Sequence, residues 1–178
     1  LDQTAHMVAT ILIACILTSM QPLFGNPSSA IRKYAFSEHN WHDYEAHGRG
    51  IRGNGFLFVK NSRPALALQG PADSVRSPSH VSLQEKRDAK QLTAAQQDVF
   101  LTPRPLVEFY DLRSDPHQLN NLAGNAEFAT QQKELAVTLG TWIDETHDSV
   151  PMDISHDSFD RETGKALKTK DYRQTTPG

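Results

Sequence analysis

The residues best suited to chemistry lie in one polar stretch, residues 38–52. Three histidines, three carboxylates and two arginines fall within these fifteen positions. Such a set predicts a pocket for an anionic, hydroxyl-rich ligand, because Arg49 and Arg52 can fork onto sulfate or carboxylate oxygens. The hydroxyls would hydrogen-bond to polar neighbours and the sugar face would stack on an aromatic ring. These groups are His39, Asn40 and Asp43 for the hydroxyls, and Trp41 or Tyr44 for the ring.

Two other interpretations of the same stretch stay open. It could be a solvated hairpin loop whose charges pair with one another and whose aromatic rings cover a sheet edge. It could also be a metal site built from His39, His42 and either Asp43 or His47. Zinc needs three or four converging donors, and the usual helical His-Glu-x-x-His signature is absent.

Composition narrows the class of protein. The chain has 178 residues, about one domain, with 38% hydrophobic and 22% charged residues. Its formal net charge of −3 provides no basic excess for a nucleic acid backbone, so no nucleic acid partner is expected. Any anion must therefore be held by a local cluster of cations. The single cysteine, Cys15, rules out an internal disulfide and, among apolar neighbours, is expected to be inert.

The most apolar segment runs from Met7 to Met20. It has no positively charged start, which a secretory signal requires, and it is shorter than the roughly 20 apolar residues of a membrane span. We therefore expect a buried helix or strand here, with no signal peptide and no membrane span.

Hydrophobic patterning predicts three strands. Residues 31–37 and the apolar run 56–59 form the first two, joined as a hairpin through a long polar loop, with residues 48–55 as a glycine-rich turn or bulge. Residues 107–112 form the third. With helices on one side of a small antiparallel sheet, this predicts the α+β class.

Helix signals lie mainly in the second half. Thr93 and Gln96 form a capping box, and residues 115–118 read as another helix start. The best helix spans residues 126–147, with its apolar residues on one stripe. Beyond Val150 the chain is mostly polar and is expected either to wrap the surface or to be loose.

An ordered set of motifs resembles the sulfatase family. The stretch 38–47 followed by Arg-Gly-Ile-Arg at 49–52 is similar to bacterial sulfatases related to heparan N-sulfatase. The Glu-Phe-Tyr-Asp-Leu-Arg-Ser-Asp-Pro run at 108–116 and the Asn-Leu-Ala at 121–123 resemble the general sulfatase signature. The resemblance covers about residues 21–164.

The resemblance implies a C-terminal subdomain with about four antiparallel strands and a long C-terminal helix, packed on an alkaline-phosphatase-like catalytic domain. It divides the chain into an apolar segment 1–20, the subdomain 21–150 and a polar tail 151–178. It also implies that the formylglycine, made in a Cys/Ser-x-Pro-x-Arg motif, and the calcium site belong to a missing N-terminal catalytic domain. Cys15 is followed by Ile16 and lacks that motif.

The expected role is therefore substrate contact, with no catalytic or metal-binding residue in this chain. The parent would be a periplasmic or secreted hydrolase of sulfate esters or sulfamates on glycans, like N-sulfoglucosamine sulfohydrolase in glycosaminoglycan degradation. The alternatives are a non-catalytic glycan- or anion-binding module and, third, a small metal hydrolase using the histidines. The resemblance assigns substrate contact to His39, Asn40, His42, Asp43, Arg49 and Arg52.

Overall fold

A computed structural model describes residues 19–68 and 70–167. The chain divides into two compact units, one through Ala35 and one from Phe36 onward. The first unit contains the short helix α2 (Gln21–Gly25), on which the Phe24 side chain is 90% exposed. Cys15 and nearly all of the predicted apolar segment lie outside the described residues, and the predicted boundaries at 20/21 and 150/151 stay predictions.

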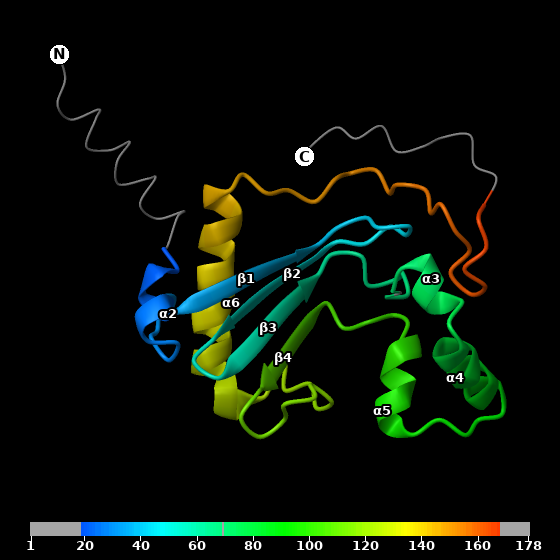
Figure 1. Cartoon of the computed structure of the whole chain (residues 1–178), viewed down its shortest axis with the longest axis horizontal. Coiled ribbons are helices and arrows are strands. Elements are labelled where there is room, and N and C mark those ends of the chain that lie inside the picture. Colours follow the sequence, from blue (N-terminus) through cyan, green and yellow to red (C-terminus); the bar gives the residue numbers. More distant parts are fainter. Residues whose placement is uncertain (1–18, 69, 168–178) are drawn as a thin grey trace, which may run out of the picture. The chain divides into compact units, whose positions relative to one another are not determined.

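A four-stranded sheet forms the centre of the fold, with the strands in the order β1-β2-β3-β4 (Figure 1). β2 pairs antiparallel with β3, and β3 pairs antiparallel with β4. The long helix α6 (Ala129–Glu145) contacts β2 and β3. The predicted α+β class, a small antiparallel sheet with a long C-terminal helix, is confirmed. The strands are β1 (Tyr34–His39), β2 (Gly48–Gly53), β3 (Phe56–Asn61) and β4 (Val107–Asp111).

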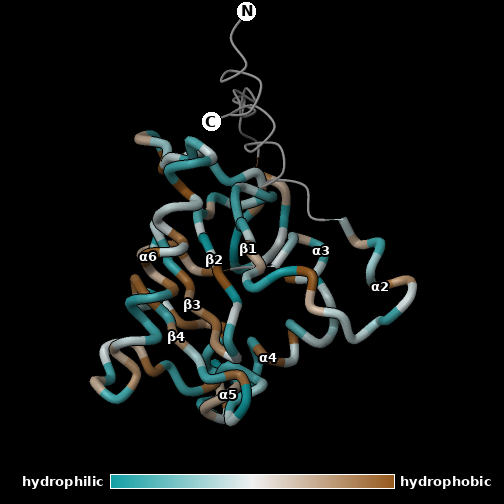
Figure 2. Tube along the Cα trace, turned by 90° about the vertical axis from the view of Figure 1, so that its left-hand side faces the viewer, coloured by the Kyte–Doolittle hydropathy of each residue, from teal (hydrophilic) through white to brown (hydrophobic). Residues whose placement is uncertain are grey.

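The core lies between the sheet and α6. The strand register places Ile51 opposite Phe58, and Phe58 opposite Phe109, so that the three side chains share one face. All three are buried, as are Leu135 and Leu139 of α6. Figure 2 shows the hydrophobic stretches of β2, β3 and α6 near one another. Each such side chain contributes about 1.5–3 kcal/mol when fully buried, which fixes the sheet on its helix.

The predicted first hairpin is wrong, because a further strand lies inside it. Residues 48–53, expected to be a turn or bulge, form β2, and the tight turn is Asn54-Gly55, with φ values of 53° and 81°. This is the Asn-Gly pattern of a type I′ hairpin turn. Gly50 has a packing reason: a Cβ there would lie 2.6 Å from Ser37 Oγ on β1. Close approach of β1 and β2, not turn formation, explains this glycine.

The predicted helix at 115–118 is also wrong. Asp115 does cap backbone N–H groups, but they belong to Leu119 and Asn120, and Gln118 has a positive φ of 57°. A residue in that conformation cannot continue a helix, so the segment is a turn. The capping box is confirmed: Thr93 and Gln96 exchange side-chain and backbone hydrogen bonds at the start of α5 (Ala94–Gln97).

The remaining helices are short. α3 (Ala72–Val75) and α4 (Pro78–Asp88) follow β3 along the chain, and no helix was predicted at either place. η1 (Asp98–Phe100) continues α5, and η2 (Ala126–Phe128) forms the first turn of the predicted helix 126–147, ahead of α6. No helix in the described part is long and apolar enough to cross a bilayer.

Residues 151–167, the described part of the chain after residue 150, wrap the surface, which was one of the two states predicted for this segment. Residues 151–167, here called the clasp, run beside the connection between β1 and β2 (Figure 1). Ser158 donates its backbone N–H to the carbonyl of Asp43, and the Asp157 carboxylate accepts the backbone N–H of Glu45. The clasp is held by side chains and isolated backbone bonds, because it contains few apolar groups.

Candidate anion-binding hollow

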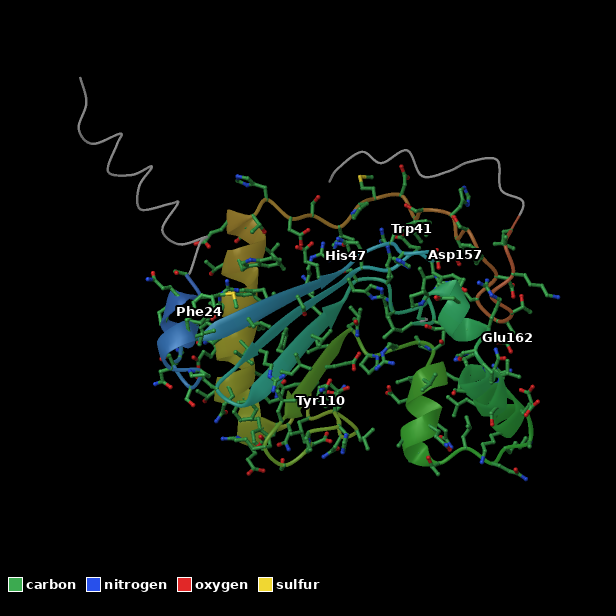
Figure 3. The ribbon with its side chains drawn as sticks, in the orientation of Figure 1. Phe24, Trp41, His47, Tyr110, Asp157 and Glu162 are labelled. Carbon is green, nitrogen blue, oxygen red and sulfur yellow. The ribbon has the colours of Figure 1, made fainter. Side chains whose placement is uncertain are left out.

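Residues 39–47, here called the His loop, connect β1 to β2 and are held by the clasp. Trp41 donates its indole N–H to the carbonyl of His156, 3.1 Å away. Figure 3 shows Trp41 and Asp157 at the same end of the sheet as His47. The loop is therefore shaped by residues more than one hundred positions later in the sequence.

A hollow of about 40 Å³ lies between the His loop and the chain that follows β3. A buried water needs roughly 10–15 Å³ by this kind of measure, so the hollow has room for about three oxygen-sized atoms. We call it the basic hollow. Among its lining residues, the ionisable groups other than tyrosine are His39, His42, His47, Glu45, Arg63, Arg104 and Arg161.

Each arginine of the basic hollow is anchored. Arg63 donates Nε–H to Glu45 Oε1 at 3.2 Å and Nη2–H to the carbonyl of Pro151 at 2.5 Å. Arg161 binds Asp157 through Nε and Nη2, at 2.6 and 2.9 Å. The carboxylate of Asp157 does not line the hollow, so positive charge predominates on its walls.

Arg104 forms the border with a wider space. A groove of about 330 Å³ lies on the sheet face that carries Leu57 and Val59, and it shares Arg104 and His39 with the basic hollow. Arg104 is bound on its other side to Glu108 and Asp98, which line this sheet groove. The two spaces are contiguous, with a basic end at the His loop and an acidic end at β4.

A buried polar network forms the floor of the sheet groove. Burial alone would raise the pKa of Glu108, but hydrogen bonds from Arg104, Tyr110 and Asn61 bring that pKa below its ordinary value. Tyr110 donates its hydroxyl to Glu108 Oε2 at 2.5 Å, and its pKa is raised by burial and by this acceptor. The network keeps Glu108 ionised and its partners fixed.

The structure brings two of the six predicted contact residues to the basic hollow, His39 and His42. Partial desolvation, with a smaller effect of nearby His42, lowers the pKa of His39. This shift favours the neutral form of His39. A bound anion beside its ring would favour the protonated form.

Arg49 and Asn40 do not line the basic hollow and bind each other instead. Arg49 is 3% exposed on the face of Ile51, and its guanidinium binds Asp148 through Nε (2.6 Å) and Nη2 (2.7 Å). Its Nη1 donates to Asn40 Oδ1 and to the carbonyl of Gly48, both at 2.9 Å. The predicted fork onto a ligand is thus occupied by the protein itself, and Asn40 braces it.

Arg52 and Asp43 do not line the basic hollow either. Arg52 is exposed three positions after Arg49 on the same strand, an odd spacing that places the two side chains on opposite faces of the sheet. Asp43, with a φ of 61°, accepts the backbone N–H of Ala72 at the start of α3 and thus joins the loop to that helix.

The described residues contain no group of three or more His, Cys, Asp or Glu side chains placed to hold a metal. Both ring nitrogens of His47 have partners within the protein: Nδ1 lies 3.1 Å from Ser62 Oγ, and Nε2 lies 3.3 Å from the carbonyl of Ser149. The histidines proposed for a metal hydrolase therefore do not form a metal site in the described part of the chain. The described carboxylates do not form a calcium site there either.

Sequence reasoning missed the partners that define the hollow. Arg63 and Arg161 were not proposed as binding residues, and Asp148 was not proposed as the partner of Arg49. One signal was present: Arg63 follows β3 within two residues, on the hairpin arm that faces the His loop. The pairing of Arg161 with Asp157 is an i, i+4 contact in a polar segment that was expected either to wrap the surface or to be loose.

Comparisons with known proteins give partial matches. No family model matches the chain. The chain is 31% identical over 96 residues to an ulvan-active sulfatase of Formosa agariphila, which covers 53% of this chain and 16% of that protein.

Two solved structures are similar. One is a protein in complex with its substrate D-glucosamine-2-N,6-O-disulfate, at 22% identity and a TM-score of 0.44, covering 75% of this chain and 20% of that one. The other is a 2-O GAG sulfatase, at 17% identity and a TM-score of 0.45, covering 78% and 22%. The chain thus spans a fifth or so of the length of each protein it matches.

Proposed function

Because this chain is related to the sulfatase family and matches only part of larger sulfatase chains, we propose that it acts as the C-terminal part of a glycan sulfatase. In this role it contributes to the grip on the sulfated sugar and does not carry the reacting groups. The substrate class would be a glycosaminoglycan of the heparan type, carrying sulfate esters or sulfamates as in the heparan N-sulfatases that the motifs resemble.

One observation carries the proposal. The basic hollow brings His39 and His42 together with the guanidinium groups of Arg63, Arg104 and Arg161, beside an open groove of about 330 Å³. A groove of that size accepts a sugar unit or two, since small-ligand sites run from about 300 Å³ upward. A sulfo group fits the small basic end and the sugar ring the wide one.

The reacting groups would lie elsewhere. We propose that an N-terminal sulfatase domain provides the formylglycine and calcium, and that the parent protein is periplasmic or secreted. When bound, calcium and the formylglycine would provide electrostatic stabilisation and the nucleophile. The residues of this chain would hold and orient the glycan and would exclude water from the sulfo group.

Exposed apolar side chains near the groove provide a surface for that domain. Leu106, directly before β4, is 64% exposed, and Leu101 is 40% exposed. Leu68, at the border between the two spaces, is 44% exposed. Contiguous exposed apolar groups with a polar border are typical of interaction surfaces. We propose that this side packs against the catalytic domain, with the glycan between the two.

The same hollow supports a second candidate, a non-catalytic glycan-binding module, and one pair of measurements separates the two. The 178-residue chain is titrated with a heparin-derived disaccharide, and sulfate release is assayed with the chain alone and after fusion to the sequence encoded upstream. The sulfatase proposal expects release only from the fusion. An upstream sequence without a Cys/Ser-x-Pro-x-Arg motif, together with saturable binding by the chain alone, would establish the module instead.

A further inference from the structure

We propose that Arg63, and neither arginine of β2, is the cation that binds the sulfo group of a glycan in the basic hollow, with His39 and His42 beside it. This inference rests on the proposed function and deepens it by naming the residue and the ligand chemistry. No motif in the sequence marks Arg63.

The two arginines of β2 are unsuited to that role. Arg49 is among the residues that line the sheet groove, but its side chain is 3% exposed and each of its three guanidinium nitrogens already donates within the protein. Arg52 is free of partners in the described part of the chain, but it lines neither the basic hollow nor the sheet groove. Neither can therefore meet an anion beside the His loop.

Arg63 is positioned for it by the β2–β3 hairpin. Ser62 donates its backbone N–H to the carbonyl of His47, which places the next residue against the His loop. The Arg63 side chain is 15% exposed, and its Nε is fixed on Glu45, whose side chain is 4% exposed. A guanidinium held in this way is pre-organised, because little rotamer freedom remains to be lost on binding.

Arg63 also has hydrogen-bonding capacity to spare. Of the five N–H groups of a guanidinium, Nε–H and one Nη2–H are used inside the described structure. The other three, both on Nη1 and one on Nη2, can meet two oxygens of a sulfo group side by side. Ring N–H groups of His39 and His42 are available for the third oxygen.

The other two arginines of the hollow are committed to the fold. Arg161 uses Nε, Nη1 and Nη2 on Asp157 and on the carbonyls of Ala67 and Glu45. Arg104 is shared between Glu108 and Asp98. They contribute charge to the walls but have few free donors, so the direct contact with the anion falls to Arg63.

The test compares two disaccharides on matched variants of the 178-residue chain. The probes are a sulfated heparin-derived disaccharide and the same disaccharide after chemical desulfation, titrated by calorimetry. Arg63→Lys keeps the positive charge beside Glu45 but loses the fork, and Glu45→Gln/Arg63→Gln removes both charges together. Arg52→Gln is the control, since it removes an exposed arginine from outside the hollow.

We expect Arg63→Lys to weaken binding of the sulfated disaccharide at least tenfold, and the double variant to weaken it further. Binding of the desulfated sugar should change less than twofold in both, as should binding of either sugar to Arg52→Gln. Circular dichroism melting of each variant shows whether the fold is kept. Because the double variant leaves no unpaired buried charge, it tests the proposal even if Arg63→Lys fails to fold.

Three outcomes would overturn the inference. Sulfated sugar that binds both Arg63 variants as tightly as the wild type removes Arg63 from the site and leaves the proposed function standing. If Arg52→Gln loses binding of the sulfated sugar and Arg63→Lys keeps it, the contact belongs to β2 instead. If the wild-type chain binds neither disaccharide, the glycan-binding role fails and this inference fails with it.

Discussion

Arg49 and Asp148, 99 positions apart in sequence, form an ion pair through two parallel hydrogen bonds of 2.6 and 2.7 Å. The pair joins the start of β2 to the chain just beyond α6, and Asn40 braces the same guanidinium from the His loop. Since the Arg49 side chain is 3% exposed and that of Asp148 is 17% exposed, the pair lies inside the protein. It fixes the base of the proposed binding site without touching a ligand.

Removal of Asp148 should be costly. Asp148→Ala leaves the Arg49 charge buried without its partner, and such a loss destabilises a protein by about 3–5 kcal/mol. The free energy of unfolding, measured by urea denaturation, tests this expectation. Asp144→Ala, at an exposed position of α6, is the control and should change that free energy by about 0.5 kcal/mol or less. Equal effects of the two substitutions would contradict the role of the pair.

Stability should fall on mild acidification because of His47. Burial, with a smaller effect from Arg49, lowers the pKa of His47 below its ordinary value of 6.5. The unfolded chain therefore binds the proton more tightly, so this contribution to stability is complete above about pH 6.5 and declines as the pH falls below it. Melting temperatures between pH 7.5 and 5 measure the decline.

His47→Gln is the matched variant for that pH series. Glutamine keeps polar groups near Ser62 Oγ and the carbonyl of Ser149 but does not titrate. Its melting temperature should fall less between pH 7.5 and 5 than that of the wild type. An unchanged dependence on pH would mean that another group is responsible, with His39, whose pKa is also lowered, as the next to replace.

Loss of the clasp should release the His loop. In a Trp142→Phe background, which leaves Trp41 as the one tryptophan, truncation after Val150 removes the carbonyl of His156 and the carboxylate of Asp157. We expect the emission of Trp41 to shift to longer wavelength, because its indole becomes hydrated. As the control, truncation after Leu167 keeps every described contact of the clasp and should leave the emission wavelength unchanged. Equal wavelength shifts in the two truncated chains would contradict the role of the clasp in holding the His loop.

The Asn54-Gly55 turn should resist substitution at its second position. Gly55 has a φ of 81°, and a Cβ there would lie 2.9 Å from Arg113 Cδ. Gly55→Ala should cost about 1–2 kcal/mol for the left-handed conformation alone, measured as the free energy of unfolding. Gly25→Ala, where a Cβ meets nothing within 4 Å, should have little effect. A cost at Gly55 no greater than at Gly25 would contradict the turn assignment.

The sequence was most informative where local physics decides. The capping box of Thr93 and Gln96, the strand at β4 and the apolar stripe of α6 were predicted correctly, because each depends on residues a few positions apart. The first hairpin was mispredicted although the Asn-Gly signal was present, because the glycines of β2 are typical of a turn. Only the packing of Gly50 on Ser37 shows another reason for one of them. The helix expected at 115–118 failed because capping by Asp115 suits a turn equally well.

The candidate site shows the same division. The sequence identified the His loop as the place to look, and His39 and His42 do line the basic hollow. Whether they contact a substrate, as was expected of all six residues, stays a prediction. Proximity in sequence could not show that Arg49 faces Asp148, or that Arg63 faces the histidines.

By itself, the sequence determined the α+β class, the relationship to sulfatases, and which stretch is rich enough in polar groups to bind an anion. The tertiary structure alone decided which arginines are free to do so. A guanidinium can bind either a ligand or a carboxylate of the protein itself. Which of the two it binds depends on which carboxylates lie within hydrogen-bonding distance. Asp148 is 99 positions from Arg49, and the Glu45 carbonyl that binds Arg161 is 116 positions from it. The distances that decide this exist only once the sheet, α6 and the clasp have come together.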